Sequence, residues 1–590
     1  MKFKTVFSVE TTLTILIVVL LSLGIAPTLI TQLNTPSERV FTLMHGYSDD
    51  FIGYTSFIKE GMDGKNTMTI RSLPTPQGVS SIHIVYVWIG KILGLLPIES
   101  THAYHLANLL FGTGFILLTF KLFQHVWSDR LTAFWSTMIA CTSTGVGYLT
   151  HVNDRWWYEG FISYRFIDNV HMRILSRPHY LIGACIFIYL ITALITTGKP
   201  DNRKTGQLVL FFILSFLLSI IHLPSGLIVL LFSIIYSLLS VLSSLLKMKH
   251  LNTKNVVDAI RNSQFVHWQF ILILLGSLFG LLVSQLSMGA YPYINLYPSV
   301  PKEIVNLPLF HPASFSYLDI GAVPNDILAL GPVFWLSIPG LLLSFFFKDQ
   351  QFKRTIFTLW FIVQCSLYFL LYPGFHVERV RFIQTLFFIP MTYGAMITLR
   401  AISHVIIKKL SYRKPLSPLA PLSHLVPSFP LSLLSLLLLF LFIPQHIFLF
   451  QQNTYAFTDF KNFSFLIFPT LKQKEIYDWL DTNTPKESRV LADYEAANHI
   501  LLYSHNYVWG NPQNWIEGPR EEMVKAKNFF FWGVMPDAQA LLYLEQHGID
   551  YIYYGYQEKT FGDITHYSFL KPVFQNEAAV VFKVSSNLPK

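Results

Sequence analysis

Long stretches without a charged residue recur along this chain, and each is close to the length that a helix needs to cross a lipid bilayer. About 20 apolar residues in a helix span about 30 Å of hydrocarbon. Backbone groups find no water in that layer, so the spanning segments are expected to be helices. The chain has 590 residues, of which 52% are hydrophobic and 13% charged, and the sequence therefore predicts a membrane protein with many spans.

We predict a polytopic α-helical bundle of about eleven spans. The first runs from Thr11 to about Leu33, behind Lys2 and Lys4, and is too long for a signal-peptide core, so it should be an uncleaved anchor with a cytoplasmic N-terminus. The other predicted spans are 104–123, 131–149, 178–197, 206–222, 224–246, 268–289, 327–346, 355–373, 379–400 and 431–451.

The loop charges predict which loops face the cytoplasm. Basic residues gather in the loops that follow residues 197, 246, 346 and 400, where the positive-inside rule puts them. That rule accounts for the formal net charge of +9 without a nucleic-acid partner. The loops 150–177, 290–326 and 373–379 and the tail after 451 then lie outside the plasma membrane of a cell that we expect to be prokaryotic.

Segment 82–97 is apolar enough to cross the membrane, but a crossing there would break the alternation of the loops. It is also short and carries His83 and Lys91. We therefore predict an interfacial helix on the outer leaflet, within a first outer loop of about 34–103.

The tail changes character, because charged residues return and the apolar runs shorten. We expect residues 1–451 to form the membrane-spanning module and 452–590 an extracytoplasmic α/β domain. Its predicted helices are 472–481, 496–504 and one from Pro536 to about Gly548, and its predicted strands are 489–494, 550–556 and 578–584.

An acidic pair, Asp49-Asp50, lies early in the first outer loop and is the leading candidate for chemistry. A carboxylate there can act as a general base on a hydroxyl group. It can also bind a divalent cation. The alternative is a solvated loop or an N-cap of a helix over 51–60. Asp50, Tyr54 and Phe57 share one face of that helix, which favours the functional interpretation.

Basic side chains on the outer side form two further clusters. Arg173, Arg177 and His179 come first, and a lipid phosphate suits the fork of arginine. Arg379 and Arg381 offer a second phosphate contact. Simple anchoring at the membrane interface, or snorkelling toward the headgroups, is the alternative for both clusters.

A metal site has little support, since no His-x-x-x-His or Cys-x-x-Cys spacing occurs. A Mg²⁺ or Mn²⁺ ion held by Asp49, Asp50 and Asp154 is the one metal site that the sequence suggests. The chain has no glycine-rich phosphate loop, which argues against a nucleotide-driven engine.

This arrangement resembles the GT-C superfamily of membrane glycosyltransferases, such as protein O-mannosyltransferases and aminoarabinose transferases. The resemblance rests on the first span, the Asp49-Asp50 pair, the Asp50-x-x-x-Tyr54 spacing and segment 82–97. It implies that Asp50 or Asp49 is the catalytic base. It also implies that basic residues such as Arg173, Arg177 or Arg379 hold the phosphate of a polyprenyl-phosphate sugar.

The function expected from the sequence is an inverting transfer of that sugar to a glycan, lipid or protein acceptor at the outer face. Tyr54, His83, Asp154 and Glu159 are then candidate acceptor or sugar contacts. The tail would recognise the acceptor or brace the first loop. Two alternatives stay open. A lipid-sugar flippase would carry ionisable residues within its spans, and a membrane-anchored scaffold would bind a partner through its tail.

Overall fold

The computed structural model describes the chain in segments, and the contacts between them form two compact units. The helical unit comprises Met1–Ala26, Asn108–Ser284 and Ser299–Gln452, and the mixed unit comprises Pro27–Ala107, Gln285–Pro298 and Asn453–Lys590. The residues described are 8–44, 48–72, 81, 83–127, 129–145, 148–152, 155–159, 174–175, 177–196, 205–246, 264–288, 311–312, 314, 330–346, 351–375, 377, 379–382, 386–412, 429–453, 466–509 and 520–585.

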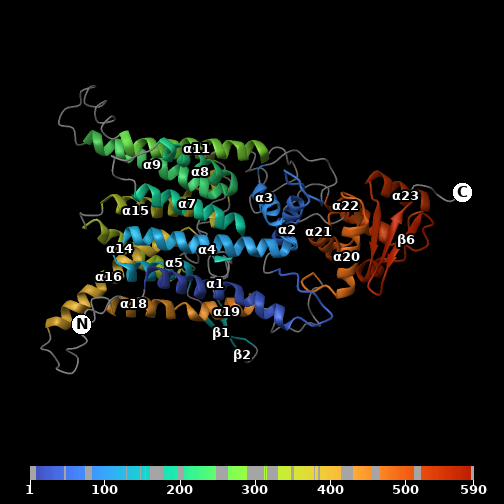
Figure 1. Cartoon of the computed structure of the whole chain (residues 1–590), viewed down its shortest axis with the longest axis horizontal. Helices are drawn as coiled ribbons and strands as arrows, with labels where there is room; N and C mark the ends of the chain where they lie inside the picture. Colours follow the sequence, from blue (N-terminus) through green and yellow to red (C-terminus); the bar gives the residue numbers. More distant parts are fainter. Residues whose placement is uncertain are drawn as a thin grey trace. The chain divides into compact units, whose positions relative to one another are not determined.

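Helices run side by side through the helical unit (Figure 1). Neighbours along the chain pack in pairs, α7 on α8 and α8 on α9, while α16 packs on α14, α5 and α18. The described α-helices of this unit are α1 (Val9–Asn34), α4 (Ser100–Val126), α5 (Arg130–Thr142), α7 (Pro178–Thr196), α8 (Thr205–Ile221), α9 (Leu223–Leu246), α11 (Gln264–Met288), α14 (Gly331–Ser344), α15 (Gln351–Ser366), α16 (Phe388–Tyr412), α18 (Phe429–Phe440) and α19 (Ile443–Asn453). Of these, α1, α4, α11 and α19 each begin or end in the mixed unit.

Six of the described helices are long and apolar enough to cross a membrane. They cover 10–34, 100–126, 178–196, 223–242, 268–287 and 351–375. Large apolar side chains are exposed on them, as Leu275, Leu278, Leu282 and Leu286 are on α11, which suits contact with lipid. The chain is an integral membrane protein. Helical residues occupy each of the eleven predicted spans, but the number that cross stays a prediction.

Three predicted spans differ from the structure at their ends. The helix expected over 131–149 ends at Thr142, before a stretch with two glycines, and strand β1 (Tyr148–Val152) pairs with β2 (Arg155–Glu159). The span expected over 379–400 begins as a 3₁₀ turn over 379–382, and α16 starts only at Phe388. The span 431–451 is broken after Phe440, because Pro444 cannot donate a backbone hydrogen bond.

The helix α15 ends in an irregular stretch as well. It passes into a π-helical turn over Leu367–Leu371 and a 3₁₀ turn over Tyr372–Phe375. Such turns inside a helix often mark functional positions.

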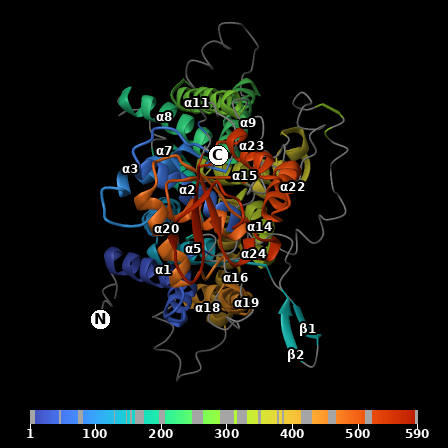
Figure 2. The same cartoon turned by 90° about the vertical axis from the view of Figure 1, so that its right-hand side faces the viewer.

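A five-stranded sheet lies among the helices of the tail (Figure 2). Its strand order is β4-β3-β5-β7-β6. β4, β3 and β5 are parallel to one another, and β7 runs antiparallel to both β5 and β6. Its strands are β3 (Arg489–Leu491), β4 (Tyr507–Trp509), β5 (Tyr551–Tyr554), β6 (Leu570–Gln575) and β7 (Val580–Val584). The tail helices are α20 (Leu471–Asn483), α21 (Tyr494–Tyr503), α22 (Arg520–Phe531), α23 (Asp537–Gln546) and α24 (Tyr556–Phe561).

The first loop contributes two helices to the mixed unit, α2 (Ser48–Met62) and α3 (Ile84–Leu93). Their backbones touch where Gly61 meets Gly90: a Cβ atom on Gly90 would lie 2.0 Å from the Ile58 carbonyl oxygen. α3 occupies the segment predicted to be interfacial, and it leaves Trp88 and Ile92 exposed. This exposure suits a helix at a membrane surface, although its position there stays a prediction.

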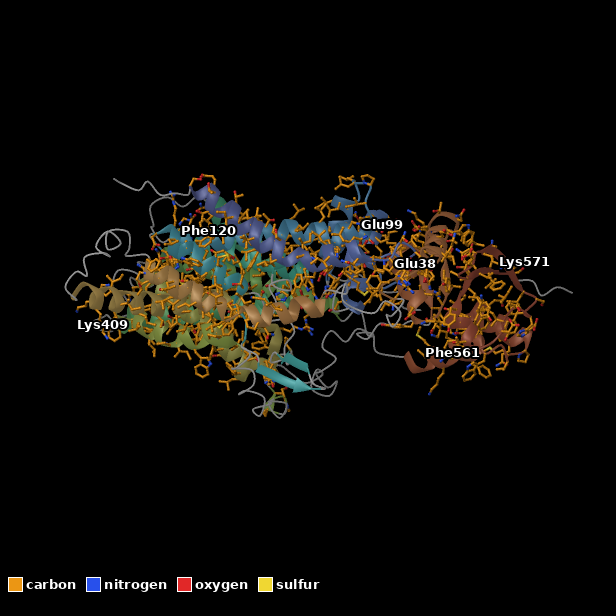
Figure 3. All side chains as sticks on the ribbon, turned by 90° about the horizontal axis from the view of Figure 1, so that it is seen from below. Glu38, Glu99, Phe120, Lys409, Phe561 and Lys571 are labelled. Atoms are coloured by element: carbon orange, nitrogen blue, oxygen red, sulfur yellow. The ribbon has the colours of Figure 1, made fainter. Side chains whose placement is uncertain are left out.

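Residues 38–42 pair with the start of the tail. The Val40 N–H donates to the Pro469 carbonyl at 2.9 Å, and the Leu471 N–H donates to the Glu38 carbonyl at 2.9 Å. Lys474 forms an ion pair with Glu99 at 3.2 Å. Figure 3 shows Glu38 and Glu99 on the segments that carry these contacts. The mixed unit thus unites 27–107 with the tail, whereas the boundary predicted at 451–452 stays a prediction.

Arg71 makes the most extensive of these connections. Its buried guanidinium donates to the carbonyl oxygens of Leu501 and Ser504, to that of Asn506 at 3.1 Å, and to Ser56 Oγ at 3.2 Å. Leu501 and the C-cap residue Ser504 lie at the C-terminal end of α21, where backbone carbonyls have no partner within the helix, and Asn506 lies just before β4. The guanidinium therefore supplies the hydrogen bonds that this helix end lacks and ties it to α2.

Arg71→Met should destabilise the mixed unit, because it leaves buried carbonyl oxygens without donors. We expect a loss of about 3–5 kcal/mol in the free energy of unfolding. Thermal unfolding of the purified protein measures the change. Lys571→Met, at an exposed position of β6, is the matched control and should fall within about 0.5 kcal/mol of the starting protein. Equal unfolding temperatures for the two variants would contradict this account of Arg71.

Asp481 should make the stability of the mixed unit depend on pH. Burial alone would raise the pKa of this carboxyl, but hydrogen bonds from His505 and the Lys59 ammonium at 3.1 Å lower it to about 2. A lowered carboxyl pKa gives stability above the unfolded value of about 4, which is lost as the pH falls toward 2. Asp481→Asn should therefore cost about 1–2 kcal/mol at pH 7, and this difference should shrink between pH 4 and pH 2. A difference that stays constant over this range would contradict the assignment.

Candidate functional site

Asp49 and Asp50 lie in the first turn of α2, which begins at Ser48. The helix therefore starts before the acidic pair, and the pair does not cap a helix that begins at Phe51. Negative charge is favoured in the first turn, because the unpaired N–H groups there carry partial positive charge. Asp50 is half-buried, which distinguishes it from a fully solvated loop residue.

An aromatic stack lies behind the acidic turn. The Tyr54 ring stacks on Tyr86 with centroids 4.3 Å apart and meets the His83 ring edge to face at 5.1 Å. Tyr86 continues the stack to Tyr104 at 6.4 Å, and Phe51 packs on Tyr104 at 5.0 Å. The structure thus brings together two predicted contacts, Tyr54 and His83, and adds Tyr86 and Tyr104, which the sequence analysis missed.

Backbone strain borders this stack. Leu43 has φ 62° and His83 has φ 56°, in the left-handed region that residues other than glycine rarely adopt. Each such residue costs on the order of 1–3 kcal/mol and persists only where its surroundings hold it. His105 supports Leu43, since its Nε2 lies 2.8 Å from the Leu43 carbonyl oxygen. Strain of this kind clusters at functional sites, which supports the candidacy of the α2 turn.

In the helical unit, two arginines meet on one tyrosine. Arg177 donates from Nη1 to the Tyr180 hydroxyl at 2.9 Å, and Arg381 donates from Nη1 to the same oxygen at 2.6 Å. Arg177 is only 3% exposed and lies just before α7, where its carbonyl accepts the N–H of Tyr180. Two guanidinium groups held at one oxygen, beside a helix N-terminus, concentrate positive charge. This is the electrostatic environment that a phosphate group favours.

Other predicted basic residues surround this pair. His179 is buried, with its ring centroid 6.1 Å from that of His222, and His222 lies 4.8 Å from the Tyr180 ring. Arg379 lies over the buried ring of Tyr368 at 5.9 Å. The structure therefore joins the two basic clusters that the sequence analysis treated separately.

Tyr180 is the link that the sequence analysis missed. Its position one turn after Arg177 at the start of a helix was the available signal, because residues three apart share a helix face.

The remaining candidates are not placed. Arg173 and Asp154 lie outside the described residues, and Glu159 ends strand β2, where only the backbone is described. Among the described side chains, no three His, Cys, Asp or Glu residues gather in a way that could hold a metal ion.

No protein-family model and no curated protein sequence matches the chain. Several solved structures, in contrast, are similar to the chain. A crystal structure of the oligosaccharyltransferase of Archaeoglobus fulgidus in the apo form superposes with a TM-score of 0.51 at 14% identity, over 94% of this chain and 70% of that one. The same enzyme tethered to an acceptor peptide gives 0.50 at 13% identity, over 92% and 69%.

The chain has the GT-C fold. ArnT from Cupriavidus metallidurans bound to undecaprenyl phosphate is also similar, with a TM-score of 0.49 at 10% identity, over 99% of this chain and 100% of that one. Identities this low establish the fold alone. Within the GT-C fold of this chain, the arginine pair and the α2 turn are the two candidate sites.

Tyr180→Phe should weaken phosphate binding, because it removes the oxygen on which both guanidinium groups are held. A hydrogen bond to a charged group contributes about 1.5–3 kcal/mol, so we expect roughly 10- to 100-fold weaker binding of undecaprenyl phosphate to the purified protein. Tyr189→Phe, on the same helix and 41% exposed, is the control and should bind normally. Unchanged binding in both variants would remove the arginine pair as the phosphate site.

Proposed function

We propose that the chain is a glycosyltransferase that moves a sugar from a polyprenyl-phosphate donor to an acceptor hydroxyl at the outer face of the membrane. The observation that carries this proposal is the pair of arginines on Tyr180, in a chain with the GT-C fold. A cleft for a neutral sugar alone has no need of two guanidinium groups at one oxygen, whereas a lipid phosphate matches them in charge and geometry.

In the proposed reaction, Arg177 and Arg381 bind the lipid phosphate and stabilise the negative charge that grows on it as it leaves. Asp50 or Asp49 takes the proton of the acceptor hydroxyl. The acceptor oxygen then attacks the anomeric carbon, and the bond between that carbon and the phosphate oxygen breaks. The electron pair of that bond stays on the lipid phosphate. A single displacement of this kind inverts the anomeric configuration.

The donor class has further support in the neighbouring structures. One is described with undecaprenyl phosphate and another with dolichol phosphate, and both ligands are polyprenyl phosphates. In the proposed topology the N-terminus is cytoplasmic and the tail is extracytoplasmic, as the loop charges predict.

Metal dependence is a separate part of the proposal. Asp49 and Asp50 would supply carboxylate oxygens to a Mg²⁺ or Mn²⁺ ion. The aspartates are hard oxygen ligands that suit either ion.

Asp50→Asn should lower sugar transfer about 10²- to 10⁴-fold, because it removes the base without changing the shape of the side chain. Transfer is measured with the purified protein, a labelled polyprenyl-phosphate sugar and a cell-envelope extract as the source of acceptors. Asp49→Asn, tested in parallel, assigns the base between the two neighbours. Asp563→Asn, at an exposed turn of the tail, is the control and should transfer normally.

Full transfer by both Asp49→Asn and Asp50→Asn would contradict the catalytic assignment. Movement of the intact labelled lipid across a vesicle membrane, without transfer, would instead identify a flippase.

A further inference from the structure

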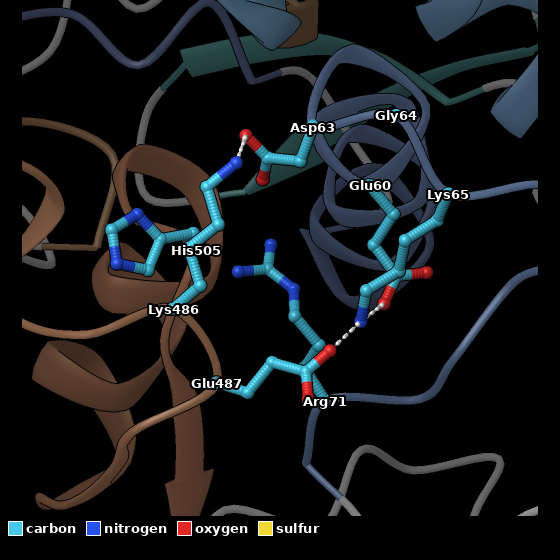
Figure 4. A pocket seen from close by; sticks show the side chains of 8 residues that line it. All are labelled: Glu60, Asp63, Gly64, Lys65, Arg71, Lys486, Glu487 and His505. Atoms are coloured by element: carbon cyan, nitrogen blue, oxygen red, sulfur yellow. Dashed lines mark hydrogen bonds and ion pairs between the residues drawn. The ribbon is translucent and has the colours of Figure 1, made fainter.

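A pocket of about 270 Å³ opens in the mixed unit between the end of α2 and the tail. Figure 4 shows charged side chains from both segments around it. Its lining residues are Glu60, Asp63, Gly64, Lys65, Arg71, Lys486, Glu487 and His505. No apolar side chain is among them, so the pocket offers nothing to a lipid chain.

The charges of the lining nearly cancel. Lys65 lies between two carboxylates, 3.4 Å from Glu60 and 3.0 Å from Glu487. Glu60 and Arg71 are both buried in the wall, and the Glu60 carboxylate also accepts the N–H of Thr69 at 2.7 Å. Burial raises the pKa of Glu60 despite these cations. Because carboxylates and cations alternate, the lining favours a neutral ligand with many hydroxyl groups over a free anion.

Buried charged side chains in the pocket wall cost folding free energy, because a protein with apolar residues of similar size in their place is often equally stable or more stable. Glu487 adds a second cost. Its φ is 69°, a strained conformation for a residue other than glycine, and its side chain is mostly exposed at the rim. Glycine would adopt this conformation freely, so the carboxylate is retained against a backbone penalty.

The ion pair between Lys486 and Asp63 at the rim of the pocket is weak. Lys486 approaches Asp63 only to 3.9 Å, and the lysine side chain is 66% exposed. Asp63 is only 21% exposed, but an ion pair at this distance with one exposed partner contributes little to stability. A ligand can therefore displace Lys486 and gain its ammonium group as a hydrogen-bond donor.

We propose that this pocket is a subsite for one sugar unit of the acceptor, which makes the acceptor a glycan. The proposal rests on the proposed function. The volume of the pocket is close to the lower end of the ~300–1,000 Å³ range of small-molecule sites and suits a single sugar ring. Carboxylates accept and ammonium groups donate hydrogen bonds, so together they can bind neighbouring hydroxyl groups of a sugar.

The position of the pocket along α2 sets its place on the acceptor. Glu60 follows Asp50 by ten residues of one helix, which corresponds to about 15 Å along the axis. The pocket therefore holds a unit some distance from the reacting hydroxyl, and a short acceptor reaches the base without filling it.

Glu487→Gly gives the sharpest test, because it removes the rim carboxylate and relieves the strained backbone together. The probes are the methyl glycosides of glucose, mannose, galactose and N-acetylglucosamine, added to the full-length purified protein and followed by saturation-transfer NMR. At least one should bind, and Glu487→Gly and Lys486→Ala should each weaken it about 10-fold. The thermal midpoint of Glu487→Gly should stay equal or rise. Lys571→Ala is the control and should bind normally.

If none of these glycosides binds, or if both variants bind as well as the starting protein, the subsite proposal is wrong. This assay needs no transfer, so it fails independently of the proposed function.

Acceptor length gives a second readout that separates binding from structural support. With a trisaccharide acceptor, the two variants should raise KM about 10-fold at unchanged kcat, while KM for the corresponding methyl glycoside should not change. An equal loss on both acceptors would show that the charges only brace α2, and would also overturn the subsite.

Discussion

The buried guanidinium of Arg71 is the interaction on which the mixed unit depends most. It satisfies two carbonyl groups at the end of α21 and a third just before β4, and it reaches Ser56 on α2. On its other side α2 touches α3 through paired glycines, with no room for a side chain. The helix that presents Asp49 and Asp50 is therefore held on two sides, by α3 and by Arg71. Arg71 in turn binds a part of the tail that lies more than 400 residues away in the sequence.

This arrangement gives the tail a structural part in the proposed chemistry. A catalytic carboxylate is effective only when its position is held to a fraction of an ångström. The strained backbone at Leu43 and His83 shows that the surroundings of α2 are tight enough to hold unfavourable conformations. The arginine pair follows the same logic, because Tyr180 holds two like charges at one oxygen.

Much of the fold was predictable from the sequence, because hydrocarbon allows few alternatives to a helix. Helical residues occupy every predicted span, and the tail elements at 471–483, 489–491, 494–503, 551–554 and 580–584 fall where periodicity put them. Helix ends were predicted less well: α5 ends early, and α16 begins nine residues late, after a 3₁₀ turn. Hydropathy averages over a window and does not register such local breaks.

The candidate sites were predicted by residue type but not by their partners. Asp50, Arg177 and Arg381 stand out as charges beside apolar runs, whereas Tyr180 looks like any interfacial tyrosine until the fold brings position 381 to it. The strand β4, only three residues long, and the bond from Val508 to the Arg71 carbonyl depend on the same kind of distant contact. Periodicity within one segment carries no information about such pairs.

The proposed reaction is a single displacement at the anomeric carbon of a polyprenyl-phosphate sugar. The most direct measurement follows the purified protein with a donor labelled in both the sugar and the lipid, and determines the anomeric configuration of the product by NMR. The account predicts one polyprenyl phosphate released for each sugar transferred, with inverted configuration. Retained configuration, or a donor that remains intact while an acceptor is present, would contradict it.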